Sequence, residues 1–293
     1  MSDSNRQIDF ELYRYTPNIA AAVIFIVLFT LSTAYHSYQL IKCRAWYFIA
    51  FVIGGIFQII GYAARVAANS NKENVPIYSI QTILILLAPP LYAASIYIVL
   101  GRIVTYLHAE HFSLVSVKWM TGIFVTGDII AFVMQAAGGG IMASGTISAM
   151  NTGENITIGG LCVQLAFFSF FVLTSLVFHF RIRRQPTAKV LQLAQHEDSS
   201  VLRTWESVMW GLYIASVLIL IRSIFRLIEY AQGNDGYLIS HEAFMYVFDA
   251  MLMFFAMVAM NVFHPSVILN GNKRVSRGSM WSSSQTELRG RRY

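Results

Sequence analysis

Long apolar stretches, separated by short polar or glycine-rich connections, run through most of the chain. A helix rises about 1.5 Å per residue, so about 20 apolar residues are needed to cross a hydrocarbon core of about 30 Å. The pattern predicts an all-α membrane protein, with a seven-helix transmembrane bundle over residues 18–265. The expected helices are Asn18–Ile41, Ala45–Ala68, Ile77–Leu107, Trp119–Ala143, Ile158–Phe180, Trp205–Glu229 and Glu242–His264.

The composition fits a membrane protein. Of 293 residues, 56% are hydrophobic and 12% are charged, whereas a soluble domain carries about 25% charged residues. This balance argues against a single water-soluble domain. The formal net charge of +6 would fit a nucleic-acid-binding protein, but its distribution along the chain fits membrane topology better. With two cysteines, Cys43 and Cys162, no disulfide framework is expected.

The basic residues predict the orientation of the bundle. Cytoplasmic loops of membrane proteins carry an excess of Lys and Arg. The connections on the opposite side hold only Arg6, Arg14 and Lys72, so we expect the N-terminus outside the cytoplasm and the C-terminus inside it. The basic residues of the predicted cytoplasmic side are Lys42, Arg44, Lys118, Arg181, Arg183, Arg184, Lys189, Arg203, Lys273, Arg274, Arg277, Arg289, Arg291 and Arg292.

Both ends of the chain are predicted to lie outside the membrane. Residues 1–17 form an extracytoplasmic segment whose acidic residues precede a full-length apolar helix, so no cleaved signal peptide is expected. Residues 266–293 form a basic, Ser-rich cytoplasmic tail that we expect to be disordered. On the outer side, Asn155 begins the triplet Asn155-Ile156-Thr157, a candidate glycosylation site.

Ionisable and amide side chains lie inside the predicted helices, where a charge costs about 2.5–3.5 kcal/mol on insertion and normally finds a partner. Within several helices they recur seven residues apart, nearly two turns, and therefore share one face. We expect them to meet in one ion-paired, hydrogen-bonded network toward the outer leaflet. The residues of this predicted network are Arg65, Asp128, Gln135, Arg222, Arg226, Glu229, Glu242 and Asp249.

Two interpretations of this network remain open. The charges could serve only to hold the helices in register, as buried ion pairs. Alternatively, part of the network lines a cavity for the head group of an amphipathic substrate, with Arg226 and Asp249 as the strongest candidates. Pro89 and Pro90, in the middle of the third expected helix, remove backbone donors and predict a kink that is either a hinge or static.

Several classes of function lack their motifs. The chain has no Gly-Lys-Ser or Gly-Lys-Thr of an ATP-binding loop. No lysine lies within a predicted span, which excludes a retinal Schiff base. The histidines do not form the His-Glu-x-x-His helical pair of a zinc protease, although ligands from separate helices could still converge. We therefore expect no enzymatic activity, no catalytic residue, no metal and no cofactor.

Several longer motifs stand in a distinctive order along the membrane part of the chain. They are Gly61-Tyr62 with Arg65; the run from Leu87 to Tyr97 with Leu100-Gly101-Arg102; Asp128 with the run from Gln135 to Gly140; the run from Ile221 to Tyr230; and Gly233, Glu242, Tyr246, Asp249-Ala250 and His264-Pro265. Over residues 14–270, this set resembles the fungal lipid-translocating exporter family. The resemblance implies a seven-helix protein with relatives linked to aminocholesterol and drug resistance, export of sphingoid long-chain bases and, in one branch, protoporphyrin uptake.

The leading hypothesis is a transporter or translocator that moves an amphipathic lipid or lipophilic toxin across the membrane or between its leaflets. Such activity would contribute to resistance to drugs or lipid stress. The expected partners are membrane lipids and an amphipathic small molecule, with no nucleic acid. The plasma membrane is the expected location, and another secretory or vacuolar membrane is the alternative. The competing hypothesis is a seven-helix lipid receptor or stress sensor, which binds a lipid and signals without transporting it.

Overall fold

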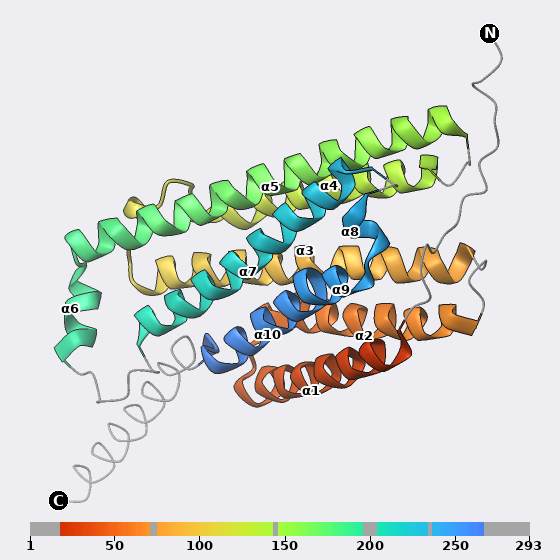
Figure 1. Ribbon diagram of the computed structural model, residues 1–293. Coiled ribbons are helices and arrows are strands. Elements are labelled where there is room, and N and C mark those ends of the chain that lie inside the picture. Colours follow the sequence, from red (N-terminus) through yellow and green to blue (C-terminus); the bar gives the residue numbers. More distant parts are fainter. Residues whose placement is uncertain (1–17, 71–74, 143–145, 196–203, 234–235, 267–293) are drawn as a thin grey trace, which may run out of the picture.

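The computed structural model describes residues 18–70, 75–142, 146–195, 204–233 and 236–266 of the chain. Within these ranges the chain forms a bundle of long helices that lie side by side (Figure 1). The predicted outer segment and all but the first residue of the predicted tail lie outside the described residues.

Seven helical segments of the described chain are long and apolar enough to span a membrane, which confirms the predicted number and the all-α fold. Six are single helices: α1 (Ile19–Cys43), α2 (Ile49–Ser70), α3 (Val75–Tyr106), α4 (Val117–Met142), α5 (Ile147–Arg184) and α7 (Trp205–Ala231). The seventh segment is built of α9 (Glu242–Met245), a π-helical turn η4 (Tyr246–Met251) and α10 (Leu252–Val262).

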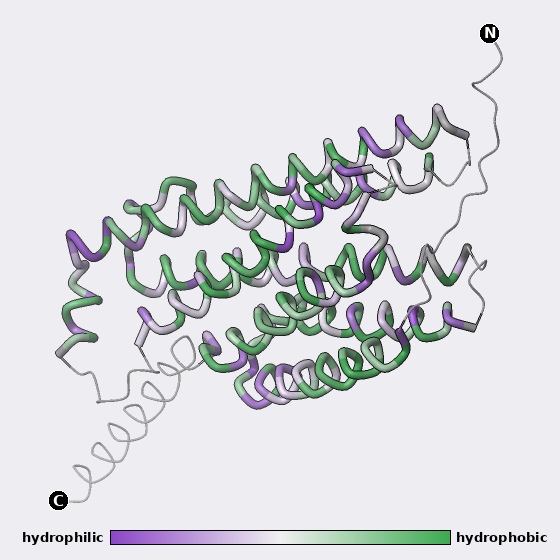
Figure 2. Tube along the Cα trace, viewed as in Figure 1, coloured by the Kyte–Doolittle hydropathy of each residue, from purple (hydrophilic) through white to green (hydrophobic). Residues whose placement is uncertain are grey.

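Short helices lie in the connections. These are η1 (Trp46–Phe48) between α1 and α2, η2 (Glu110–Phe112) before α4, α6 (Ala188–Gln195) after α5, and α8 (Tyr237–Ser240) before α9. The end of the bundle where α1, α3 and α5 finish and where α4 begins carries Arg44, Lys118 and Arg184, and is called the basic end below. Figure 2 shows apolar residues along the middle of the long helices, as expected for spans in a bilayer.

The fifth span begins earlier than the apolar pattern predicted. It starts at Ile147 rather than Ile158 and holds 38 residues, a length of about 57 Å. Thr146 caps it, because its side chain accepts a hydrogen bond from the Ala149 amide at 3.3 Å. A helix can continue past the apolar layer on polar residues, which an apolar pattern does not detect. Asn155 therefore lies on α5, exposed, and its glycosylation stays a prediction.

Glycines allow α4 and α5 to approach closely at the end opposite the basic end. A Cβ atom on Gly138 would lie 2.5 Å from the Gly153 carbonyl oxygen, and one on Gly153 would collide with the Gly138 carbonyl oxygen. Small residues at such crossings permit backbone contact in membranes, where helix association depends on close packing. These two glycines therefore fix the distance between α4 and α5.

Aromatic rings pack against one another in the interior of the bundle. The ring centroids of Phe48 and Phe51 are 4.5 Å apart, and that of Phe51 lies 4.6 Å from Tyr92 on α3. The ring centroid of Tyr97, five residues further along α3, lies 4.5 Å from that of Phe171 on α5. All five side chains are fully buried. Dispersion contacts between these rings help to hold α2, α3 and α5 together.

Candidate functional site: two buried charge clusters

Three arginines point into the bundle. Arg65 on α2 and Arg222 on α7 are 1% and 2% exposed, and Arg226 lies one turn beyond Arg222 on the same face of α7. An unpaired charge in an apolar interior is costly, so each guanidinium group needs a carboxylate partner. The structure provides these partners in two clusters.

The Asp249 cluster consists of Arg222, Arg226, Glu229 and Asp249. Asp249 is fully buried and accepts from both arginines: its Oδ1 from Arg222 Nε, and its Oδ2 from Arg226 Nη2 at 2.5 Å. Arg226 Nη1 also donates to Glu229 Oε2 at 2.8 Å. Asp249 lies in the π-helical turn η4, an irregularity that is frequent at functional sites in helices.

A proline on α3 connects this cluster to a third element. Pro89 has no N–H, so the carbonyl oxygen of Ile85, four residues earlier, lacks its usual helical donor. Arg222 Nη2 donates to that oxygen at 3.4 Å. Helix α3 continues through Pro89 and Pro90 as one helix, and movement at this point stays a prediction. Arg222 thus bridges α3, α7 and η4.

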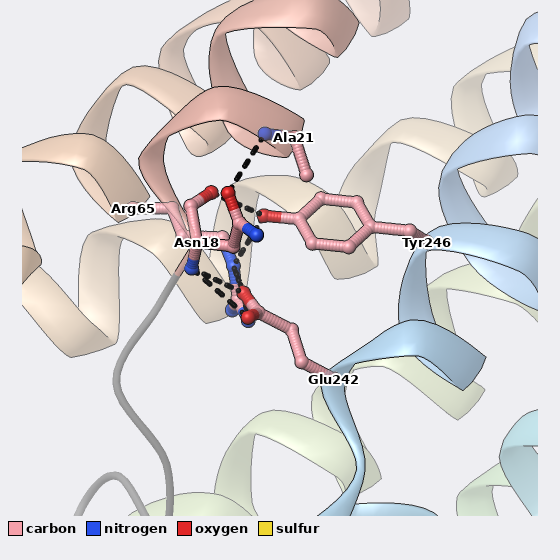
Figure 3. Close-up of polar contacts among 5 residues, drawn as sticks. All are labelled: Asn18, Ala21, Arg65, Glu242 and Tyr246. Atoms are coloured by element: carbon pink, nitrogen blue, oxygen red, sulfur yellow. Dashed lines mark hydrogen bonds and ion pairs between the residues drawn. The ribbon is translucent and has the colours of Figure 1, made fainter.

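The Glu242 cluster consists of Asn18, Arg65, Glu242 and Tyr246 (Figure 3). Arg65 Nη2 lies 2.7 Å from Glu242 Oε1, and Arg65 Nε donates to the Tyr246 hydroxyl at 3.2 Å. The backbone N–H of Asn18 donates to both oxygens of the Glu242 carboxylate, at 2.9 and 3.1 Å. The side-chain oxygen of Asn18 caps α1 by accepting from the backbone N–H of Ala21. Glu242 therefore ties the first turn of α1 to α2 and α9.

Tyr62 lies between the two clusters. Its ring is 6.1 Å from that of Tyr246, and the tyrosine interacts electrostatically with Arg65, Arg226 and Asp249. Its hydroxyl group is buried and makes no hydrogen bond within the described part of the chain. An unsatisfied hydroxyl at this position is available to a ligand or to a buried water.

Asp128 and Gln135 lie apart from the arginines. The Tyr97 hydroxyl donates to Asp128 Oδ2 at 3.0 Å, and Gln135 Nε2 donates to Gln164 Oε1 at 3.1 Å. These contacts join α4 to α3 and α5. Spacing along the sequence had placed both residues in one network with the arginines, but the structure gives separate groups, because α4 faces α3 and α5.

The two clusters are balanced in charge. Arg65, Arg222 and Arg226 face Glu229, Glu242 and Asp249. The side chains of Glu242 and Arg226 are each 14% exposed, the largest values in the two clusters' ion pairs, and Arg226 Nε has no hydrogen-bond partner in the described residues. Among the charged members of the two clusters, Glu242 and Arg226 are therefore the most accessible to another molecule.

The histidines form no metal centre that the structure describes: within the described ranges, no group of three or more His, Cys, Asp or Glu side chains is arranged to hold a metal ion. The rings of His36 and His264 are 6.2 Å apart. His264, just beyond the last span, is buried, and this burial lowers its pKa to about 4. Its ring is therefore neutral at neutral pH.

Tyrosines that contact the charges were not part of the predicted network. Tyr62 precedes Arg65 by three residues, and Tyr246 follows Glu242 by four and precedes Asp249 by three. At these spacings side chains share a helix face, which was the available signal for both residues. No spacing along one helix pointed to Asn18, because its backbone N–H donates to Glu242, which is far away in the sequence.

Seven apolar spans around paired charges define an integral membrane protein with a polar, charge-balanced interior. More particularly, the chain belongs to the RTA1-like protein family, whose model matches residues 51–272. The family resemblance of the motifs is thereby confirmed.

Three relatives from Saccharomyces cerevisiae illustrate the family. Protein RTM1 is 35% identical, over 88% of this chain and 93% of its own. Protoporphyrin uptake protein 1 is 35% identical, over 86% of this chain and 91% of its own. The sphingoid long-chain base transporter RSB1 is 29% identical, over 87% of this chain and 73% of its own. Two of these names describe a transporter or an uptake protein, and none describes an enzyme. No solved structure matches the chain.

Proposed function

We propose that this protein moves an amphipathic molecule with a charged head group across a membrane or between its leaflets. The Glu242 and Asp249 clusters, with Tyr62 between them, form the polar path, while the apolar part of the substrate remains among the helices or in lipid. The names of two relatives support this class of substrate, since sphingoid bases and protoporphyrin both combine an apolar body with polar groups. The activity would contribute to resistance against lipophilic drugs or lipid stress.

One observation carries the proposal: the ion pairs of Arg226 leave it able to bind something else. Arg226 is held by Asp249 and Glu229, yet its Nε atom is unpartnered in the described structure. A carboxylate on a substrate could accept from this atom, and an ammonium group could compete with Arg226 for Glu229. Arg226 could therefore bind a substrate carboxylate through Nε while it keeps both of its own carboxylate partners.

Pro89 offers a route to movement. Because the Ile85 carbonyl is held by a side chain of α7 rather than by its own helix, α3 can bend there when Arg222 changes partner. Such a change would expose the clusters to one side of the membrane and then to the other, as in transporters with broken helices.

The proposal also includes an orientation and a location in the cell. The basic end faces the cytoplasm, in agreement with the excess of Lys and Arg there, and the Glu242 cluster lies at the opposite end. The plasma membrane is the proposed site of action.

The test is transbilayer movement of two probes, a fluorescent sphingoid base and protoporphyrin, in liposomes that hold the purified protein. Arg226→Gln and Glu242→Gln are expected to slow movement at least about tenfold, since each removes a charge-assisted contact with the head group. Arg183→Gln is the matched control, because Arg183 pairs with Glu206 at the exposed surface of the basic end.

Two outcomes would overturn the proposal. If native protein binds a probe but moves none, the sensor hypothesis gains support. If movement persists undiminished in both cluster variants, the polar path is elsewhere. Size-exclusion elution and unfolding temperature in detergent confirm that each variant is folded before its flux is compared.

A further inference from the structure

A second candidate site lies at the basic end, away from both charge clusters. There, α5 and the short helix η2 border a groove of about 730 Å³. Its volume is within the range of about 300–1,000 Å³ that is usual for small-molecule sites. Apolar side chains line the part of the groove nearer the middle of the bundle, and Arg181 and Arg184 line the part at the end of α5.

The residues of α5 in the groove follow one face of the helix. Leu176, Phe180 and Arg184 are each four residues apart, so they form a stripe about 12 Å long that begins apolar and ends charged. Leu176 is 49% exposed and Phe180 is 68% exposed. In a bilayer Leu176 and Phe180 would contact acyl chains, and the stripe would reach the head-group region at Arg184.

The charged half of the groove has hydrogen-bond donors that could bind an anion. Arg181 Nη1 donates to the backbone oxygen of Phe112 on η2 at 3.2 Å, which holds the guanidinium group against the loop. Arg184 forms no ion pair with any residue that the structure describes. His111 adds a third potential donor, and no Asp or Glu is among the described residues that line the groove.

We infer that this groove binds an anionic phospholipid of the leaflet at the basic end. Its phosphate is held by Arg181 and Arg184, and one acyl chain lies along Phe180 and Leu176. Guanidinium groups match phosphate oxygens in geometry as well as charge, and basic pockets beside membrane spans are suited to anionic head groups. A soluble anion would not use the apolar half of the stripe, so the lipid accounts for both halves.

The experiment is lipid binding to the full-length protein, measured by native mass spectrometry from micelles containing phosphatidylserine or phosphatidylcholine. We expect phosphatidylserine to be retained preferentially by the native protein. Arg181→Gln with Arg184→Gln should weaken its binding about tenfold, whereas Arg181→Lys with Arg184→Lys should retain part of it. The matched control is Arg183→Gln, which removes a charge from another face of the same turn, where Glu206 already pairs with it.

Further measurements distinguish binding of the lipid from binding of a free anion. Phe180→Ser should weaken phosphatidylserine binding without affecting competition by inorganic phosphate or glycerophosphoserine. The inference is overturned if phosphatidylcholine is retained equally, if Arg183→Gln has the same effect as the double variant, or if the head group without chains competes as well as the intact lipid. The four substituted positions, 180, 181, 183 and 184, are exposed, so the variants should still fold. Their unfolding temperatures check this.

Discussion

At the residue scale, the buried carboxylate of Asp249 depends most strongly on its charged partners. One fully buried carboxylate accepts from two guanidinium groups. We expect Asp249→Asn to reduce the free energy of unfolding by about 3–5 kcal/mol, because a neutral amide would leave Arg222 buried with no carboxylate partner. Unfolding in detergent, followed by circular dichroism, measures this loss.

Asp128→Asn is the matched comparison for that measurement. Asp128 is also buried, but its contact in the structure is the hydroxyl of Tyr97, and an asparagine oxygen can accept the same hydrogen bond. Its unfolding free energy should change by about 1 kcal/mol or less. Equal losses in the two variants would show that burial alone, rather than the pairing with arginines, sets the cost at Asp249.

The sequence could identify the buried charges but not all of their partners. Charge within an apolar span was sufficient to single out Arg222, Arg226 and Asp249, because such residues are rare in membranes. It could not separate Asp128 from them, since the rotation of each helix and the order of its neighbours are not visible in one sequence. Nor could it identify the bond from Arg222 to the Ile85 carbonyl, which depends on how α3 and α7 are aligned.

At the element scale, α3 depends on another helix for one of its backbone hydrogen bonds. We expect Pro89→Ala to raise the unfolding temperature, since an interior proline costs a helix about 3 kcal/mol. It should also slow transport, because the new amide would compete with Arg222 for the Ile85 carbonyl. Unfolding temperature and liposome flux, measured on the same preparation, test both parts.

The neighbouring proline provides the control for α3. Pro90→Ala also restores an amide, but this amide would face the carbonyl of Leu86, one residue beyond the carbonyl that Arg222 contacts. Its flux should therefore stay closer to that of the native protein. If both variants transport at the native rate, the link between α3 and Arg222 has no part in movement.

The elements themselves were predictable where the apolar pattern was complete. All seven spans match predicted helices, since a stretch of about 20 apolar residues has few other stable conformations in a bilayer. The start of α5 at Ile147 was missed because its first turns are polar, and α6 was missed because it is short and amphipathic.

At the scale of the whole molecule, the distribution of basic residues makes a directional prediction. An epitope attached at the C-terminus should bind antibody only after cells expressing the protein are permeabilised, and one at the N-terminus should bind on intact cells. A cytoplasmic marker protein, detected in parallel, controls for leakage. C-terminal labelling of intact cells would contradict the orientation and reverse the direction assigned to each end of the bundle.

The balance of three arginines against three carboxylates also has an electrical consequence. Moving one unbalanced elementary charge across the whole of a 100 mV membrane voltage involves about 2.3 kcal/mol of work. The paired clusters add no net charge, so if they shift together the field does almost no work on them. A bound head group that carries a charge would change this balance. The voltage would then act on the loaded protein and leave the empty one nearly unaffected.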